Sequence, residues 1–122
     1  VDIKERIKKV DEMIAKYTKD KHYKIKGDPP ATIYADTLCN KDTGPYTLYY
    51  ASFATLDTEI QEAMKIHENV HVKQCKKYPF IGYKWDIWLN NIRQGWPGLF
   101  EIPAYKVEKI NLENTSTKLK CK

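Results

Sequence analysis

Apolar residues near the start of the chain recur every three or four positions, which is typical of an amphipathic helix. They are Ile3, Ile7, Val10, Ile14 and Tyr17. Asp2 and Glu5 precede most of this run with the spacing of a capping box, Asp taking the place of Ser or Thr. The pattern therefore predicts a helix over residues 3 to about 19, with its Lys and Glu face toward solvent.

Two later segments are rich in Tyr, Thr and Phe, which favour strands. Residues 31–38 read ATIYADTL, and residues 46–54 read YTLYYASFA. Turn-forming residues bound them: Gly-Asp-Pro-Pro at 27–30, and Asn-Lys-Asp-Thr-Gly-Pro at 40–45. The segments predict two strands, paired antiparallel.

A second capping-box spacing, Thr58 to Gln61, predicts a helix that runs to about Tyr78 and is stopped by Pro79. Farther on, apolar residues between Trp85 and Ile92 again have helical spacing, and residues 94–98 (QGWPG) break that pattern.

A last helix is expected from near Glu101, with Pro103 tolerated in its first turn. It should continue through Val107 and Ile110. The polar residues after 113 are expected to form a loose tail.

The order of these segments predicts an α+β fold in a single domain spanning residues 1–122. An N-terminal helix precedes a short antiparallel sheet, which is followed by further helices. Hydrophobic residues make up 42% of the chain and charged residues 30%, a composition typical of a globular domain. No apolar run approaches the about 18 residues of a membrane span, so we expect none. The chain begins at Val1, which we interpret as a sign of processing or excision.

The formal net charge is +5, which raises the question of nucleic-acid binding. The basic residues are spread along the chain, and only Arg6 and Arg93 among them are arginine. Arginine is the residue favoured for bidentate recognition of bases and phosphates. We therefore interpret the charge as a solvated surface and regard nucleic acid as an unlikely partner.

The most specific motif in the chain is His67-Glu68-Asn69-Val70-His71, an H-E-x-x-H string inside the second predicted helix. Residues four apart on a helix lie on one face, so His67 and His71 can direct two imidazoles at one metal ion. Glu68 then lies beside the metal, where it can take a proton from water. The spacing predicts a zinc site with its own general base.

A catalytic zinc site needs a third protein ligand. Gln74 and Lys77 stand where the metzincin extension would need Gly and His, so that class is excluded. Among the downstream acids Glu101 is favoured, because small Ala104 on the same helix permits a close approach. Glu108, seven residues later, is a second candidate, or a hydrogen-bond partner for a histidine N–H. Asp86 and Glu113 are further acidic candidates for the third ligand. His22 is expected to be a surface residue rather than a ligand.

Three cysteines leave at least one without an intrachain partner. We favour a bridge from Cys121, near the chain end, to either Cys39 or Cys75, because it would tie down a loose tail. The alternative is three reduced thiols in a cytosolic protein. Cys75 follows His71 by one turn and is expected in the core or in a disulfide rather than as a ligand.

Two motifs resemble those of a known family. HENVHVKQ, residues 67–74, looks like the H-E-x-x-H-V-x-Q string of small bacterial zincins of the gluzincin kind. EIPAY, residues 101–105, resembles the E-x-x-A-Y of a later helix in such proteins. These proteins occur as effector or toxin domains and as extracellular peptidases. The resemblance covers roughly residues 46–112.

The resemblance implies a zincin-like fold, with Zn²⁺ held by His67, His71 and Glu101. It implies Glu68 as general base and makes Tyr105 a candidate to steady the oxyanion, although a core aromatic is an equal alternative for Tyr105.

The function expected from these features is zinc-dependent hydrolysis of peptide bonds, with the substrate extended along the strand at 46–54. The same features favour a secreted or periplasmic effector or toxin, and a cognate inhibitor or immunity protein as partner. Two alternatives remain open: a zinc-stabilised binding module without turnover, and a basic nucleic-acid-binding domain.

Overall fold

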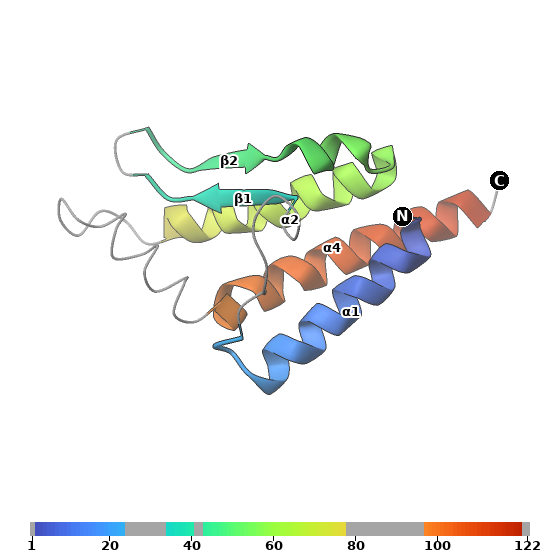
Figure 1. Ribbon diagram of the computed structural model, residues 1–122, viewed down its shortest axis with the longest axis horizontal. Helices are drawn as coiled ribbons and strands as arrows, with labels where there is room; N and C mark the ends of the chain where they lie inside the picture. The colour runs from blue at the N-terminus through green and yellow to red at the C-terminus, as the bar shows by residue number, and fades with distance from the viewer. Residues whose placement is uncertain (1, 24–33, 41–42, 78–96, 121–122) are drawn as a thin grey trace.

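The computed structural model describes residues 2–23, 34–40, 43–77 and 97–120. Figure 1 shows their arrangement. The elements are α1 (Ile3–Lys19), β1 (Ala35–Leu38), β2 (Tyr46–Tyr49), the 3₁₀ helix η1 (Ala51–Thr55), α2 (Thr58–Lys77) and α4 (Pro97–Lys120). The long helix α4 packs against both α1 and α2, and the sheet lies on α2. This α-rich arrangement with a small antiparallel sheet is compatible with the expected α+β class.

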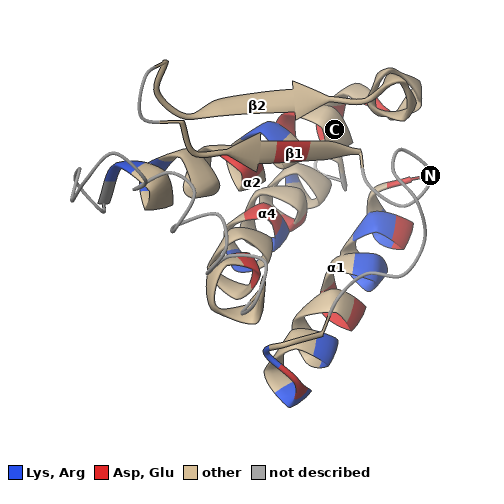
Figure 2. Ribbon diagram, turned by 60° about the vertical axis from the view of Figure 1, so that its left-hand side comes forward, with Lys and Arg blue, Asp and Glu red and all other residues tan. Residues whose placement is uncertain are grey.

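The first helix is confirmed with the predicted bounds. The backbone N–H of Glu5 donates to Asp2 Oδ1 at 2.8 Å, so Asp2 caps one of the free donors at the helix start. Val10, Met13 and Tyr17 are buried, and they form the stripe that α1 turns toward the core. Figure 2 shows Lys, Arg, Asp and Glu along the rest of α1.

The strands pair antiparallel as predicted, with Thr37 opposite Thr47 in the register. Their hydroxyl oxygens lie 2.8 Å apart on the face that meets α2. Gly44, in the connection, has φ 83°, a conformation that favours glycine. The segment 31–33 lies outside the described residues.

The strand expected over 46–54 is wrong in its second half, because β2 ends at Tyr49 and η1 follows. The N–H of Phe53 donates to the carbonyl of Tyr50 at 2.9 Å, and that of Leu56 to Phe53 at 3.2 Å. This turn places the side chains of Phe53 and Leu56 in the core. Burial of two large apolar groups here outweighs the strand preference of the local sequence.

The last helix is longer than predicted at both ends. It begins at Pro97 rather than near Glu101, and it continues to Lys120 through the segment expected to be loose. Pro97 suits a first helical position, where no N–H donor is needed. Pro103 lies inside the helix instead of in its first turn, and it forgoes the hydrogen bond to the carbonyl of Leu99.

Gly98 fixes where α4 starts relative to α1. Its N–H donates to the carbonyl of Lys21 at 2.9 Å, and a Cβ at this position would lie 2.8 Å from Lys21 Cα. Only glycine permits that approach. Pro97 and Gly98, the last two residues of the predicted break at 94–98, are the first residues of α4, and the other residues of that break are not described.

One core cluster joins the three described α-helices to η1. Its buried members are Val10, Met13, Tyr17, Phe53, Leu56, Ile60, Ala63, Met64, Tyr105 and Leu112. Among the described helices, none has the length and apolar content that crossing a membrane would require. The helix predicted between Trp85 and Ile92 lies outside the described residues.

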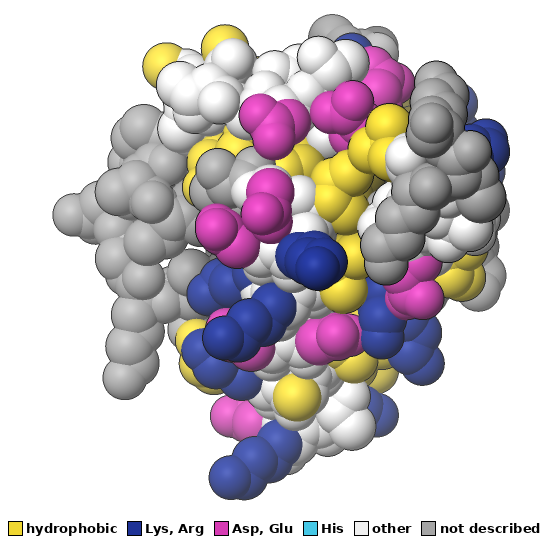
Figure 3. Space-filling model, turned by 90° about the vertical axis from the view of Figure 1, so that its right-hand side faces the viewer, with side chains coloured by type: hydrophobic (Ala, Val, Ile, Leu, Met, Phe, Trp, Pro, Cys, Tyr) yellow, Lys and Arg dark blue, Asp and Glu magenta, His cyan; other side chains and the backbone are white. Residues whose placement is uncertain are grey.

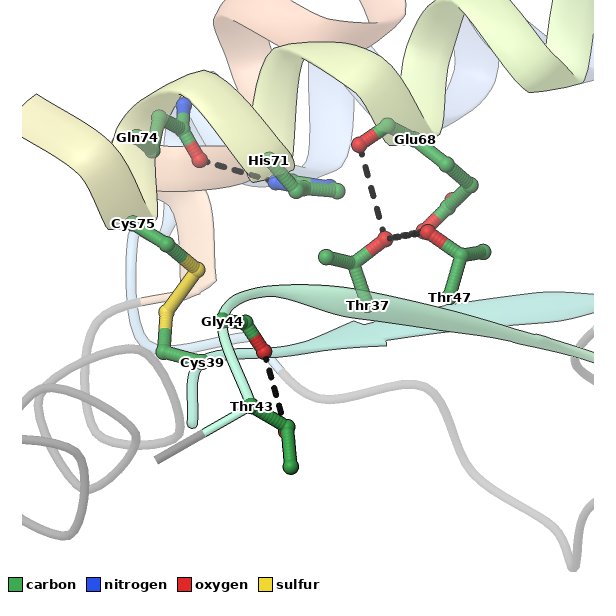
Figure 4. The surroundings of a disulfide bond; sticks show 9 residues. All are labelled: Thr37, Cys39, Thr43, Gly44, Thr47, Glu68, His71, Gln74 and Cys75. Carbon is green, nitrogen blue, oxygen red and sulfur yellow. Dashed lines mark hydrogen bonds between the residues drawn. A yellow bond between two sulfur atoms is a disulfide. The ribbon is translucent and has the colours of Figure 1, made fainter. Parts of the chain in front are cut away.

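A disulfide joins Cys39 to Cys75, with the two Cα atoms 5.5 Å apart (Figure 4). The expected bridge from Cys121 is wrong, because both of its candidate partners are bonded to each other. Three reduced thiols are excluded for the same reason. The antiparallel sheet carries Cys39, just past β1, over the last turns of α2, and Phe100 packs against the buried bridge.

The disulfide closes a loop over a sequence separation of 36 residues, so its removal should release chain entropy in the unfolded state. We expect the double variant Cys39→Ser/Cys75→Ser to lose about 3–4 kcal/mol of unfolding free energy. Urea denaturation measures this loss. The control Cys121→Ser should match the wild type, and an equal loss in that control would contradict the pairing.

Candidate metal centre

The histidines of the H-E-x-x-H string face α4 from one side of α2. Their rings lie with centroids 5.1 Å apart, and both side chains are buried. Glu101, in the first turns of α4, reaches them: its Oε1 lies 2.5 Å from His71 Nε2, and its Oε2 lies 3.4 Å from His67 Nε2. One ligand atom from each of the three residues falls within 4.8 Å of the others. The cluster could hold a metal ion, and it brings together the three residues expected as ligands.

A buried nitrogen without a hydrogen bond supports a cation at this point. His71 Nε2 makes no hydrogen bond, although the carboxylate of Glu101 is so close to it. The distance between His71 Nε2 and the Glu101 carboxylate is that of an ion pair, but an ion pair requires a positive charge on the imidazole. A buried nitrogen that faces a carboxylate is satisfied by a cation bound to both.

Glu108 lies behind His67 rather than among the three converging residues. Its Oε1 is 2.9 Å from His67 Nδ1. Arg6 of α1 holds the same carboxylate with two hydrogen bonds, Nε to Oε2 at 2.6 Å and Nη2 to Oε1 at 3.1 Å. Of the two roles left open for Glu108, this geometry corresponds to the hydrogen-bond partner of a histidine. Sequence reasoning missed Arg6, because no local signal connects residues 102 positions apart.

His71 has a different partner on its Nδ1 side. Gln74 Oε1 lies 2.8 Å from His71 Nδ1, and Gln74 Nε2 donates to the carbonyl of Phe100 at 3.0 Å. From the sequence alone, Gln74 was treated as a mismatch to the metzincin pattern and as the last residue of the HENVHVKQ string, and no contact with His71 was assigned to it. Its spacing of three residues from His71 on a helix was the signal that could have identified it.

Glu68 lies beside the cluster, and a hydrogen bond from the sheet orients its carboxylate. Thr37 Oγ1 donates to Glu68 Oε1 at 2.8 Å, and Thr37 in turn contacts the hydroxyl of Thr47 (Figure 4). The second oxygen, Oε2, lies 3.6 Å from His67 Nε2. Glu68 is thus oriented toward the space that the three candidate ligands share, while remaining outside their set.

Tyr105 packs its ring edge-on against His67, with centroids 4.5 Å apart, and stacks on Tyr17. It is buried in the core cluster, and burial raises the pKa of its hydroxyl well above the usual value. This setting favours the core-aromatic interpretation, in which Tyr105 supports the His67 ring. The oxyanion role stays a prediction.

The other candidate residues lie elsewhere. His22 is exposed, as expected for a surface residue, and its backbone N–H donates to Asp20 Oδ1 at 2.9 Å. Glu113 is exposed near Lys109, with Oε1 3.8 Å from the Nζ. Asp86 lies outside the described residues.

The buried cluster is short of positive charge. With both histidines neutral, the described residues oppose the carboxylates of Glu68, Glu101 and Glu108 with a single guanidinium, that of Arg6, which pairs with Glu108. Burial disfavours a charged His67, but its hydrogen bonds to Glu101 and Glu108 outweigh burial and raise its pKa to about 10. The carboxylates therefore stabilise a positive charge at the cluster of His67, His71 and Glu101, either as a proton on an imidazole or as a bound metal ion.

The pKa values of the carboxyl groups agree with that description. Burial alone would raise the pKa of Glu101, but His71 and His67 lower it well below the ordinary value. Glu108 behaves likewise, with His67 and Arg6 overcoming its burial. Glu68 differs, since burial prevails and raises its pKa.

Comparisons of the chain with protein-family models, with curated protein sequences and with solved structures give no match. The resemblance to small gluzincins therefore stays a prediction, and the function must be argued from the site.

The raised pKa of His67 makes the stability of the metal-free protein depend on pH. The folded state binds this proton more tightly than the unfolded state, so the stabilisation is complete below pH 6.5 and is lost as pH rises toward about 10. Urea denaturation in the presence of a chelator, over that pH range, measures the decline.

The variant His67→Gln should flatten the decline, and His22→Gln, which removes an exposed imidazole, should leave it as in the wild type. A wild-type stability that stays constant from pH 6.5 to pH 10 would contradict this electrostatic description.

Proposed function

We propose that the protein is a zinc-dependent metallopeptidase of the zincin type, with His67, His71 and Glu101 as metal ligands and Glu68 as general base. The observation that carries the proposal is the convergence of these four side chains from α2 and α4, of which all but the partly buried Glu101 are buried. Two imidazole nitrogens and one carboxylate oxygen form a donor set typical of catalytic zinc, with a fourth position for water or substrate. Calcium and magnesium prefer ligand sets of oxygen alone.

A zinc ion held by His67, His71 and Glu101 would supply Lewis acidity for the activation of water and of the substrate carbonyl group. The protein's part in the reaction belongs mainly to Glu68. Its carboxylate accepts a proton from the attacking water and returns it to the leaving amine. The hydrogen bond from Thr37 to Oε1 leaves Oε2 directed at the shared space, which supports this role. A pKa raised by burial also suits a group that both takes up and gives back a proton.

The proposed substrate is a peptide held in extended form along β2. One edge of β2 pairs with β1, and no other described strand pairs with it. Tyr46, Leu48 and Tyr49 on this strand are exposed, so they are accessible to a substrate. Partial burial raises the pKa of Tyr49, and the charge of Glu68 raises it further, which supports a position near the reacting groups. An extended peptide could then add to the sheet through backbone hydrogen bonds.

We propose a secreted or periplasmic location, supported by the buried disulfide. Such bridges form and persist in oxidising compartments and are rare in the cytosol. An effector or toxin role, and an inhibitor or immunity protein as partner, stay predictions from the sequence resemblance.

The charge distribution favours a peptidase over a nucleic-acid-binding domain. On the face shown in Figure 3, basic and acidic side chains lie beside one another, and both kinds alternate along α1. A nucleic-acid interface would gather the basic ones into a stripe. The non-catalytic zinc module has no use for a carboxylate held as Glu68 is.

Metal content tests the ligand set. We expect about one zinc per chain in the wild type after dialysis, as a single three-ligand site requires. His71→Ala and Glu101→Ala should each lose the zinc, because either change leaves two protein ligands. Elemental mass spectrometry of the purified variants gives the ratio.

The control for this experiment is Glu113→Ala, an exposed glutamate on the same helix as Glu101, which should keep its zinc. Zinc retained in Glu101→Ala would exclude Glu101 as the third ligand. A wild type that binds no zinc on reconstitution would overturn the proposed function.

Activity tests the general base. We expect Glu68→Gln to keep its zinc and to hydrolyse peptides about 10²–10⁴-fold more slowly, because the amide cannot accept the proton. A library of internally quenched fluorescent peptides provides the assay. Glu62→Gln, which changes an exposed glutamate on the same helix, should retain wild-type rates. Undiminished hydrolysis by Glu68→Gln would show that another group is the base.

A further inference from the structure

Gln74 connects one candidate ligand to the backbone that carries another. It follows His71 by three residues on α2, so the two side chains lie on the same face (Figure 4). Its Oε1 lies 2.8 Å from His71 Nδ1, and its Nε2 donates to the carbonyl of Phe100 at 3.0 Å. Phe100 immediately precedes Glu101 in α4.

The donor and acceptor capacities of these groups determine which group donates in each of the two linked hydrogen bonds, from His71 to Gln74 and from Gln74 to Phe100. A backbone carbonyl oxygen only accepts, so the amide nitrogen of Gln74 must face Phe100. The amide oxygen then faces His71, and it also only accepts. A neutral His71 must therefore carry its proton on Nδ1, which leaves the lone pair of Nε2 directed at Glu101.

We propose that Gln74 is a positioning residue that sets the tautomer and ring orientation of His71 for metal binding. The inference rests on the metal site of the proposed function and extends it to a side chain that binds no metal. Without Gln74, the neutral imidazole would be free to place its proton on Nε2, where it would block coordination. Populating the wrong tautomer lowers the apparent affinity for the metal.

The choice of an amide follows from the charge of the cluster. His67 already has a carboxylate partner, Glu108, whose charge is balanced by Arg6. The described residues around Gln74 include no corresponding arginine contact. A neutral amide holds His71 without adding a further negative charge to a buried group of carboxylates.

The hydrogen bond from Gln74 to Phe100 also couples the position of His71 on α2 to that of Glu101 on α4. Gln74 lies on α2, and the carbonyl that orients it belongs to the turn of α4 that bears Glu101. The neighbouring Cys75 is fixed by its disulfide to Cys39, so the end of α2 is itself anchored. A shift of α4 away from α2 would thus release the orientation of His71 together with the carboxylate of Glu101.

The first test compares zinc affinities by competition with a fluorescent chelator, which needs no substrate. Gln74→Met preserves the size of the side chain and removes both hydrogen bonds. We expect it to weaken zinc binding by about 10–100-fold, as for other partners of metal-bound histidines. Gln74→Glu restores an acceptor for His71 Nδ1 but adds a charge and cannot donate to Phe100, so it should recover part of the affinity, which a purely steric role would not produce.

The matched control is Gln61→Met. Gln61 is on the same helix and also donates to a backbone carbonyl, that of Leu56 at 2.8 Å, but among the described residues its side chain makes no hydrogen bond to a histidine. Its loss should leave the zinc affinity unchanged. An affinity reduced as much in Gln61→Met as in Gln74→Met would attribute the effect to helix stability and overturn the inference.

The second test observes the tautomer directly by two-bond ¹H–¹⁵N correlation of the histidine rings, in protein with and without zinc. We expect the His71 proton on Nδ1 in the wild type and in Gln61→Met, and a loss of this single tautomer in Gln74→Met.

The two tests separate this inference from the proposed function. If wild type binds zinc and Gln74→Met binds it equally well, the positioning role is wrong while the metal site stands. If wild type binds no zinc, the proposed function fails, and the role of Gln74 in metal binding fails with it, even where the tautomer depends on Gln74.

Discussion

The buried carboxylate of Glu108 joins all three helices of the described structure. Arg6 of α1 donates two hydrogen bonds to it, and the imidazole of His67 on α2 approaches it from the other side. A carboxylate without exposure to water is costly unless it is paired and hydrogen-bonded, so Glu108 requires both neighbours. The helix packing and the orientation of the first candidate ligand therefore depend on one another.

The sheet performs a comparable task for Glu68. Two short strands contribute little to the core, yet they carry Thr37 to the place where its hydroxyl meets the carboxylate. Cys39 follows Thr37 by two residues, and its disulfide to Cys75 keeps this end of the sheet against α2. The sheet thus orients Glu68, the proposed general base, while the helices orient the candidate ligands. Separate supports of this kind hold reacting groups in fixed relative positions.

Much of the fold was predictable wherever the signal was local. The cap and apolar spacing gave α1, and the turn residues gave the strand pair. The errors arose where packing overrides propensity. Phe53 lies in a segment that favours a strand but turns into the core, and the polar end of α4 is helical although it lacks an apolar stripe. Once a helix is nucleated, each added residue brings a further hydrogen bond, which a search for apolar periodicity does not register.

The sequence by itself determined that His67, Glu68 and His71 share one turn of a helix, because that relation depends only on helical periodicity. It also narrowed the third candidate ligand to Glu101 or Glu108. Only the tertiary structure decided that Glu101 faces Nε2 of His67 and that Glu108 faces its Nδ1. The two glutamates lie seven residues apart on one helix and therefore on nearly the same face, so helical periodicity does not distinguish them. The pairing of Cys39 with Cys75 and the contact of Arg6 with Glu108 were likewise decided by packing. They join segments far apart in the chain, and no local pattern records which distant surface a side chain will meet.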